Sequence, residues 1–268
     1  MEGRQNCTGS WVVRHKGFEP RRPVLVVGLP GIGFVSKLAV DHLVKSLKAE
    51  NVATLYSPYF PNQVLALKNG RIRLFSLRFY RKALKGRDII LLKGDIQPLT
   101  VEGQYEVCGK VLDYFESAGG AEVVSMAGFA VNGQVEKPSV YCTSTSKGMY
   151  ETFRKEYGAK QLKRIVPIVG IAGLLPALSR MRGMNGACVL VETPGTFIDP
   201  KGAATLVSVL SKIFGQKLDT EHLDRRAKKA EEMLAKLGEQ VARAEGQRAG
   251  ELSPEEMLKR NESLSYIR

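Results

Sequence analysis

The sequence predicts an α/β fold in which a mostly parallel, mixed sheet is flanked by helices on both faces. Strand-like apolar runs alternate with amphipathic segments along residues 1–217, which is typical of this class. The runs at 23–29 and 87–95 are apolar almost throughout, as expected of strands buried on both faces. Asn69-Gly70 stands between two alternating runs and indicates an antiparallel hairpin, because both turn residues must tolerate positive φ.

The first half of this region should contain strand, helix, strand, hairpin and strand, in that order. After the strand at 23–29, apolar residues recur at helical spacing from Phe34 to Lys48. "NVATLYS" follows as a second strand, and "QVLALKNGRIRLFSL" forms the hairpin. Within the hairpin's return strand, period-two alternation places Ile72 and Leu74 on one face and the arginines on a solvated face. The strand at 87–95 completes this half.

The second half repeats the alternation of helix and strand. Thr100 is the expected N-cap of a helix that stops at Gly119-Gly120. "AEVVSMAGFAV" is the next strand, and a short helix is expected near Lys147–Tyr157. Glycines and a proline divide "RIVPIVGIAGLLPALSRM" into strand, turn and helix. "GACVLVE" is the last central strand, and "DPKGAATLVSVLSKIFG" is a helix with Pro200 near its start.

Three segments follow from these patterns: an α/β core domain at 1–217, an amphipathic helix at 218–248 and a flexible tail at 249–268. The helix carries a heptad-like apolar seam that fits packing on its own body and pairing with a partner subunit equally well. The tail is polar and rich in Gly, Ser and Pro, which favours loose order. The seam residues are Leu223, Ala227, Ala230, Leu234, Leu237 and Val241.

The net charge of +13 raises the possibility of a nucleic-acid partner, so its position along the chain matters. Basic and acidic residues balance from Lys217 onward, and the excess lies on the body, most densely at 71–87. Aromatic residues between arginines there would suit RNA, but a solvated strand face has the same residue pattern, so we do not expect a nucleic-acid partner. No apolar run is long enough for a membrane span, no secretory signal is present, and a cytoplasmic protein is expected.

The turn "GLPGIGFVSK" raises the question of a phosphate site. Gly28 and Gly33 have the glycine spacing of a P-loop, but Phe34 and Val35 occupy the positions of its Lys and Ser/Thr. The dinucleotide fingerprint fails as well, since Ser36 replaces its third glycine. We expect the turn mainly to connect strand and helix tightly. Weak anion binding by Gly28, Gly31 and Gly33 remains open, and so does a nucleotide-dependent, ligase-like enzyme.

No other constellation predicts an enzyme. The three histidines and four cysteines share no metal-ligand spacing, the cysteines should be reduced structural thiols, and there is no GxSxG elbow. Asp95, Glu102 and Glu192 could line the carboxyl end of the sheet, but acidic residues at strand ends are common. The sequence therefore gives no reason to expect a catalytic residue, a metal or a cofactor.

Five motifs in a fixed order give the chain a recognisable resemblance. Together they resemble the proteasome assembly chaperone 2 family, in particular its archaeal branch, from about Pro23 to about Met233. The resemblance implies an α/β fold akin to that of purine nucleoside phosphorylases, without their catalytic residues. It also implies a homo-oligomer that binds the proteasome core particle or its α-subunits. The motifs are "GLPGIGFVSKLAVDHLVKSL", "LLKGDIQP", "GFAVNG", "GIAGLLPALSRMRGMNGACVLVETPG" and "DPKGAATLVSVLSKIFG".

The end of the chain is the part that the resemblance connects with binding. Leu264, Tyr266, Ile267 and the terminal carboxylate of Arg268 combine apolar, aromatic and anionic groups on a polar segment. This resembles the hydrophobic-Tyr-any ending of proteasome activators, which inserts between α-subunits. Here the tyrosine lies third from the end, one residue further in than in that motif. We expect these four residues to form the proteasome-binding site.

Overall fold

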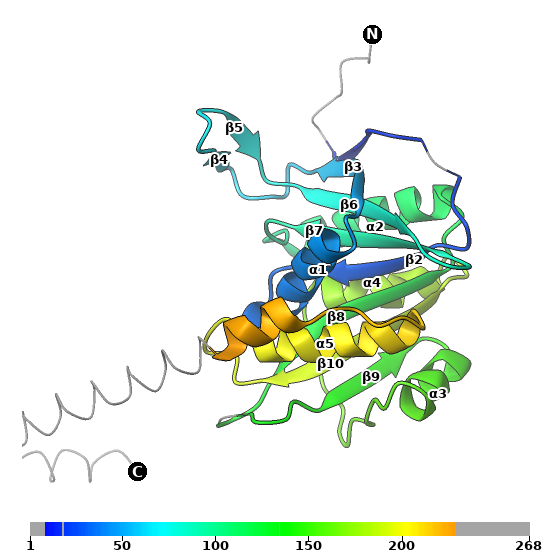
Figure 1. Cartoon of the computed structure of the whole chain (residues 1–268). Coiled ribbons are helices and arrows are strands. Elements are labelled where there is room, and N and C mark those ends of the chain that lie inside the picture. The colour runs from blue at the N-terminus through cyan, green and yellow to red at the C-terminus, as the bar shows by residue number, and fades with distance from the viewer. Residues whose placement is uncertain (1–8, 18, 134, 229–268) are drawn as a thin grey trace, which may run out of the picture. The chain divides into compact units, whose positions relative to one another are not determined.

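The computed structural model describes residues 9–17, 19–133 and 135–228 (Figure 1). The chain divides into two compact units, Met1–Asp224 and Arg225–Arg268, and the fold described below is that of the first. Most of the expected C-terminal helix and the whole expected tail, residues 249–268, lie outside the described residues.

One eight-stranded sheet forms the centre of the fold, in the order β1-β3-β6-β7-β2-β8-β10-β9. The four central strands β7, β2, β8 and β10 are parallel, and antiparallel strands extend the sheet on both sides. The predicted mixed α/β sheet is therefore confirmed, with its parallel part at the centre. The strands are β1 (Trp11–Arg14), β2 (Val24–Gly28), β3 (Glu50–Tyr56), β6 (Leu77–Ala83), β7 (Asp88–Gly94), β8 (Glu122–Ala130), β9 (Val140–Ser144) and β10 (Asn185–Thr193).

Helices cover both faces of this sheet (Figure 1). α1 (Val35–Ser46) and α5 (Pro200–Ile213) pack together on one face, over an apolar core cluster that includes Val26 and Leu91. α2 (Val101–Ser117) and α4 (Ile171–Arg180) pack on the other face, over a second cluster that includes Leu25 and Leu92. The neighbouring residues of β2 and β7 thus face opposite clusters, as their continuous apolar runs predicted. The short helices are η1 (Ile32–Phe34) and, beside β9, α3 (Lys147–Lys155).

The expected N-cap at Thr100 and the hairpin are confirmed. The Thr100 hydroxyl accepts a hydrogen bond from Gly103 N at 3.1 Å, and Asp199 caps α5 in the same way through Gly202 N at 2.9 Å. Asn69-Gly70 lies in the turn between β4 (Val64–Ala66) and β5 (Ile72–Leu74), which form a separate two-stranded antiparallel sheet. Short-range signals therefore gave these local structures correctly.

The structure differs from the sequence prediction in four places. β1 and β9 were not predicted, and the stretch expected to continue as one strand after Ile72 is divided into β5 and β6. The division lies at Ser76, whose N–H donates to the Asp95 carboxylate and whose carbonyl accepts from Asp95 N. The strand expected within residues 164–168 does not form, because Ile165 is fully exposed and Pro167 has no N–H for a ladder.

Candidate functional site

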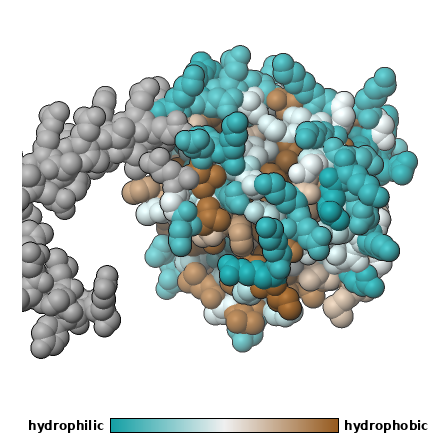
Figure 2. Space-filling model, turned by 90° about the horizontal axis from the view of Figure 1, so that it is seen from below, coloured by the Kyte–Doolittle hydropathy of each residue, from teal (hydrophilic) through white to brown (hydrophobic). Residues whose placement is uncertain are grey.

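The carboxyl ends of the parallel strands, where α/β folds place their sites, carry loops with exposed apolar side chains. Most of the large exposed apolar residues of the described part belong to segments at this end. Figure 2, a view from below, shows apolar side chains reaching the surface in separate groups between hydrophilic ones. The large exposed apolar residues at the carboxyl end include Ile32, Phe34, Val64, Leu67, Ile72, Leu74, Leu99, Val101, Tyr105, Phe197 and Ile198.

The glycine turn at this end has structural contacts that account for two of its glycines. A Cβ on Gly28 would overlap the Ser36 carbonyl oxygen and the Val40 side chain, so glycine lets β2 approach α1 closely. Gly33 has φ +63°, and a Cβ there would lie 2.6 Å from the hydroxyl oxygen of Thr193. Gly31 has an extended backbone and open space around it.

The residues of the displaced Ser-Lys pair also have structural partners. The buried Ser36 hydroxyl donates to the Leu29 carbonyl at 2.8 Å, and Lys37 pairs with Asp41 one helical turn further on. Phe34, at the lysine position of a P-loop, has left-handed φ and is partly exposed. These contacts favour the structural interpretation of the turn. Anion binding by Gly28, Gly31 and Gly33 stays a prediction, which calorimetric titration of the intact chain with ATP would test.

We expect Gly28→Ala to lower the free energy of unfolding by about 1–3 kcal/mol, because the added methyl group overpacks the contact between β2 and α1. Gly31→Ala is the matched control and should change it by less than about 0.5 kcal/mol, since its Cβ meets nothing. Urea denaturation followed by circular dichroism measures both. Equal effects of the two substitutions would contradict a packing role for Gly28.

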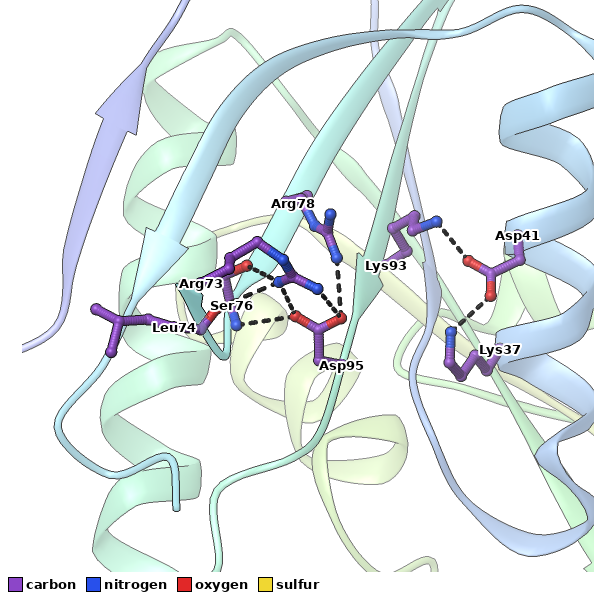
Figure 3. A network of polar contacts seen from close by, with 8 residues as sticks. All are labelled: Lys37, Asp41, Arg73, Leu74, Ser76, Arg78, Lys93 and Asp95. Carbon is purple, nitrogen blue, oxygen red and sulfur yellow. Dashed lines mark hydrogen bonds and ion pairs between the residues drawn. The ribbon is translucent and has the colours of Figure 1, made fainter. Parts of the chain in front are cut away.

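A polar network lies beside this turn and was not predicted from the sequence (Figure 3). Asp95, just after β7, accepts hydrogen bonds from two arginines: Arg73 of β5, which uses both terminal nitrogens, and Arg78 of β6, at 2.9 Å. Burial alone would raise the pKa of Asp95, but the hydrogen bonds and charges of Arg73 and Arg78 lower it below the usual range. Asp95 thus fastens the β4–β5 hairpin to the body.

A second carboxylate in the network, Asp41 of α1, joins the helix to the sheet (Figure 3). Lys37 pairs with it from the preceding turn, and Lys93 of β7 reaches it across the helix–sheet boundary at 2.6 Å. Burial opposes ionisation of Asp41, yet its bonds to the two lysines lower its pKa. Both carboxylates are therefore used as anchors between elements.

The lowered pKa values of Asp41 and Asp95 predict a loss of stability in acid. A carboxyl whose pKa is lower in the folded chain stabilises it above the unfolded pKa, about 3.9, and this contribution disappears as the pH falls through the folded value. We expect Asp95→Asn to lose stability less steeply than the intact chain below about pH 4. Thermal unfolding at a series of acidic pH values measures this. If the unfolding midpoints of Asp95→Asn and of the intact chain fell in parallel with pH, the prediction would be contradicted.

The other two acidic residues expected at this end do not join Asp95 in a cluster. Glu192 accepts hydrogen bonds from the Tyr141 hydroxyl at 2.7 Å and from Ser139 N at 2.9 Å. Burial would raise the pKa of Glu192, but these bonds lower it. Glu102 lies exposed in the first turn of α2. The three carboxylates thus have separate surroundings.

Thiol and metal chemistry find no support in the described part. Cys108, Cys142 and Cys188 are free and buried there. Burial raises the pKa of Cys108 and Cys142 to about 12 and that of Cys188 to about 11, so the reactive thiolate is not formed at neutral pH. Across residues 9–17, 19–133 and 135–228, no group of His, Cys, Asp and Glu could hold a metal ion.

A cavity of about 260 Å³ lies at the opposite, amino end of the sheet. Lys16, Lys48, Glu50, Arg81 and Lys82 are among its lining residues, and Lys16 pairs with Glu50 at 2.9 Å. No residue of the glycine turn contributes to this cavity. This cavity therefore offers no space in which a nucleotide could bind beside Gly28, Gly31 and Gly33.

The start of the expected C-terminal helix packs on the core domain. Leu218 and Leu223 are buried in the α1–α5 cluster, and His42 of α1 forms a hydrogen bond with the carbonyl of Asp219. Leu223, the first residue of the heptad-like seam, therefore uses its apolar side chain within the chain itself. The later part of the seam, from Ala230, lies outside the described residues, as do the binding residues expected at the end of the chain, Leu264, Tyr266, Ile267 and Arg268.

No helix in the described part of the chain is both long enough and apolar enough to cross a bilayer.

Comparisons with known proteins agree on one family. The chain is 33% identical over 223 residues to the uncharacterized protein MJ1210 of Methanocaldococcus jannaschii, an alignment covering 83% of this chain and 86% of MJ1210. Among solved structures, it is similar to Pyrococcus furiosus PbaB, described as an archaeal proteasome activator. That match has a TM-score of 0.81 and 35% identity and covers 86% of this chain and 99% of PbaB.

A second solved structure is Pyrococcus furiosus PbaA, described as an archaeal homolog of proteasome-assembly chaperone. Its match has a TM-score of 0.75 and 26% identity and covers 97% of this chain and 100% of PbaA. The family model of the PAC2 family matches residues 25–238, most of the chain. The chain therefore belongs to the PAC2 family, as the order of its motifs indicated.

Proposed function

We propose that this protein is a non-enzymatic chaperone or adaptor of the proteasome. In this proposal it binds the core particle through the α-subunits, forms a homo-oligomer and docks its C-terminal residues on the α-ring. Its action assists assembly or activation of the particle. The similarity to PbaB carries the proposal. The two proteins are 35% identical in a match that covers 86% of this chain, and PbaB is described as an archaeal proteasome activator.

The chemistry of the described residues agrees with a binding role. Three carboxylates at the carboxyl end are engaged as anchors, whereas Glu102 is exposed: Asp41 is held by two lysines, Asp95 by two arginines, and Glu192 by Tyr141 and Ser139. The surface at this end is instead rich in exposed apolar side chains, which in a folded protein are typical of interaction surfaces. The non-enzymatic character is part of the proposal.

The proposed docking residues are Leu264, Tyr266, Ile267 and Arg268. Each such ending offers few groups, so a single docked tail should bind weakly. An oligomer makes the second and later contacts intramolecular, and avidity then exceeds the affinity of one tail by about 10²-fold or more. Oligomerisation and tail docking are therefore two parts of one mechanism.

Surface plasmon resonance on immobilised core particles tests the proposal. We expect saturable binding of the intact chain to the assembled particle and to free α-subunits, but no binding to free β-subunits. Binding to β-subunits alone, or to no form of the particle, would contradict the proposal.

A further inference from the structure

The β4–β5 hairpin projects from the body, beyond the edge of the main sheet (Figure 1). Its tip is a tight turn in which Leu67 N donates to the Arg71 carbonyl at 2.8 Å and Gly70 has φ +76°. It pairs with no strand of the main sheet. We call residues 64–74 the hairpin arm.

One face of the hairpin arm is apolar and uncovered. The register places Val64 opposite Leu74 and Ala66 opposite Ile72, so these four side chains share a face. Ile72 is 74% exposed, and Val64 and Leu74 are about half exposed. An isolated two-stranded hairpin is marginally stable in water, and a solvated apolar face makes it less so. Such a face indicates a surface that is covered in the working protein.

The opposite face of the hairpin arm is fastened to the body. Arg73 lies on it and forms the two-nitrogen contact with Asp95, and it also donates to the Leu74 carbonyl at 3.2 Å (Figure 3). Bidentate arginine–carboxylate pairs fix direction as well as distance. The hairpin arm is therefore an oriented support that presents its apolar face outward.

A second uncovered apolar surface lies at the start of α2. Leu99 is 72% exposed and Val101 is 67% exposed, and Tyr105 follows one turn later. We call these three residues and the exposed Glu102 the α2 surface. Tyr59, in the segment that leads into the hairpin arm, lies against Gly103 of α2, so both surfaces belong to the same end of the molecule.

The charges of the two surfaces are complementary. Lys68 and Arg71 stand exposed at the tip of the hairpin arm, whereas Glu102 stands within the α2 surface. Within residues 9–17, 19–133 and 135–228 none of the three forms an ion pair. Since both surfaces stay exposed, they do not cover one another within a single chain.

We propose that the hairpin arm is a subunit-contact element whose apolar face packs on the α2 surface of a second copy of this chain. A two-fold axis makes the contact reciprocal, because each copy then offers its hairpin arm to the partner and receives the partner's. The cations of each tip lie near Glu102 of the other copy, which fixes the register. This inference rests on the oligomerisation in the proposed function and identifies the surface that forms it.

Light scattering during size exclusion of the full chain tests the contact. We expect the intact chain to be an even-numbered oligomer and Ile72→Asp to run at half that mass or less. Met181→Asp is the matched control, since it places the same charge on an exposed apolar residue at the end of α4, outside both surfaces. Ile72→Asp should still unfold in one cooperative thermal transition, which shows that the variant chain remains folded. An intact chain that is monomeric, or an unchanged mass for Ile72→Asp, would overturn the proposal.

Charge exchange tests the reciprocity. Arg71→Glu and Glu102→Arg should each lower the fraction of oligomer, because each homo-oligomer then opposes like charges in both contacts. An equimolar mixture should recover it, since every mixed contact again joins opposite charges. A mixture that stays as dissociated as its components would overturn the assigned contact.

Core-particle binding distinguishes this inference from the proposed function. If the intact chain binds core particles as a monomer, the inference fails and the proteasome role stands. If Ile72→Asp keeps its mass but loses core-particle binding, the hairpin arm contacts the proteasome instead of a second copy, and the inference is again wrong. Weaker binding together with dissociation supports both.

Discussion

Removal of Leu264–Arg268 is expected to weaken binding to the core particle by about 100-fold or more. The deletion removes the apolar, aromatic and carboxylate groups that the proposed docking uses, from every subunit of the oligomer at once. The core domain should stay folded, because the residues of its two core clusters all lie between Val24 and Leu223, and the deletion removes none of them. Surface plasmon resonance against assembled core particles measures the change in apparent dissociation constant.

Single substitutions locate the effect within the tail. Tyr266→Ala should account for a large part of the loss, because an aromatic side chain offers the largest apolar area of the four residues. Ser265→Ala, its neighbour, is the matched control and should leave the dissociation constant within about twofold. Unchanged affinity after deletion of all five residues would show that the tail does not dock.

The second large effect is expected at Asp95. Asp95→Ala leaves Arg73 and Arg78 half-buried without their carboxylate and removes the acceptor of Ser76 N, so the free energy of unfolding should fall by about 1–3 kcal/mol. The hairpin arm also loses its anchor. Urea denaturation measures the stability, and hydrogen exchange at the amides of residues 64–74 measures the loosening of the arm.

An exposed ion pair provides the control for Asp95. Asp113 pairs with Arg182 at 2.7 Å, but its side chain is 52% exposed, so Asp113→Ala should cost less than about 1 kcal/mol. If the two substitutions had the same effect on stability, or if exchange in the hairpin arm were unchanged by Asp95→Ala, the anchoring role of Asp95 would be wrong.

Patterns of residues close together in the sequence predicted most of the fold. The Asn-Gly turn, the N-cap at Thr100 and the apolar runs of β2 and β7 each depend on residues close together in sequence, and the structure confirms them. β1 could not be found in this way, since its four residues become a strand only by pairing with β3.

The site at the carboxyl end depends on contacts that sequence spacing does not reveal. Arg73 and Asp95 are 22 positions apart, and among the many arginines of the basic stretch nothing in the sequence marks Arg73 and Arg78 as the pair that holds Asp95. The apolar face of the hairpin arm had a visible signal, since apolar residues alternate on both its strands. Sequence alone, however, could not show that this face is left uncovered.

The glycine turn shows why motif spacing needs a chemical check. Gly28 and Gly33 reproduce the spacing of a P-loop, yet the contacts of Gly28 with α1 and of Gly33 with Thr193 explain both by close packing. Phe34 and Val35 occupy the positions where a P-loop has Lys and Ser or Thr. This difference was visible in the sequence and favoured a tight strand-to-helix connection.

Co-migration with assembled core particles tests whether the C-terminal residues dock this chain on the proteasome. The intact chain and the chain lacking Leu264–Arg268 would each be mixed with core particles and separated by size exclusion with light scattering. We expect the intact chain to elute with the particle as a complex whose mass includes a whole oligomer, and the shortened chain to elute alone at its own oligomeric mass. Co-migration of both forms would contradict tail docking, and co-migration of neither, with particles or with free α-subunits, would contradict the proteasome role itself.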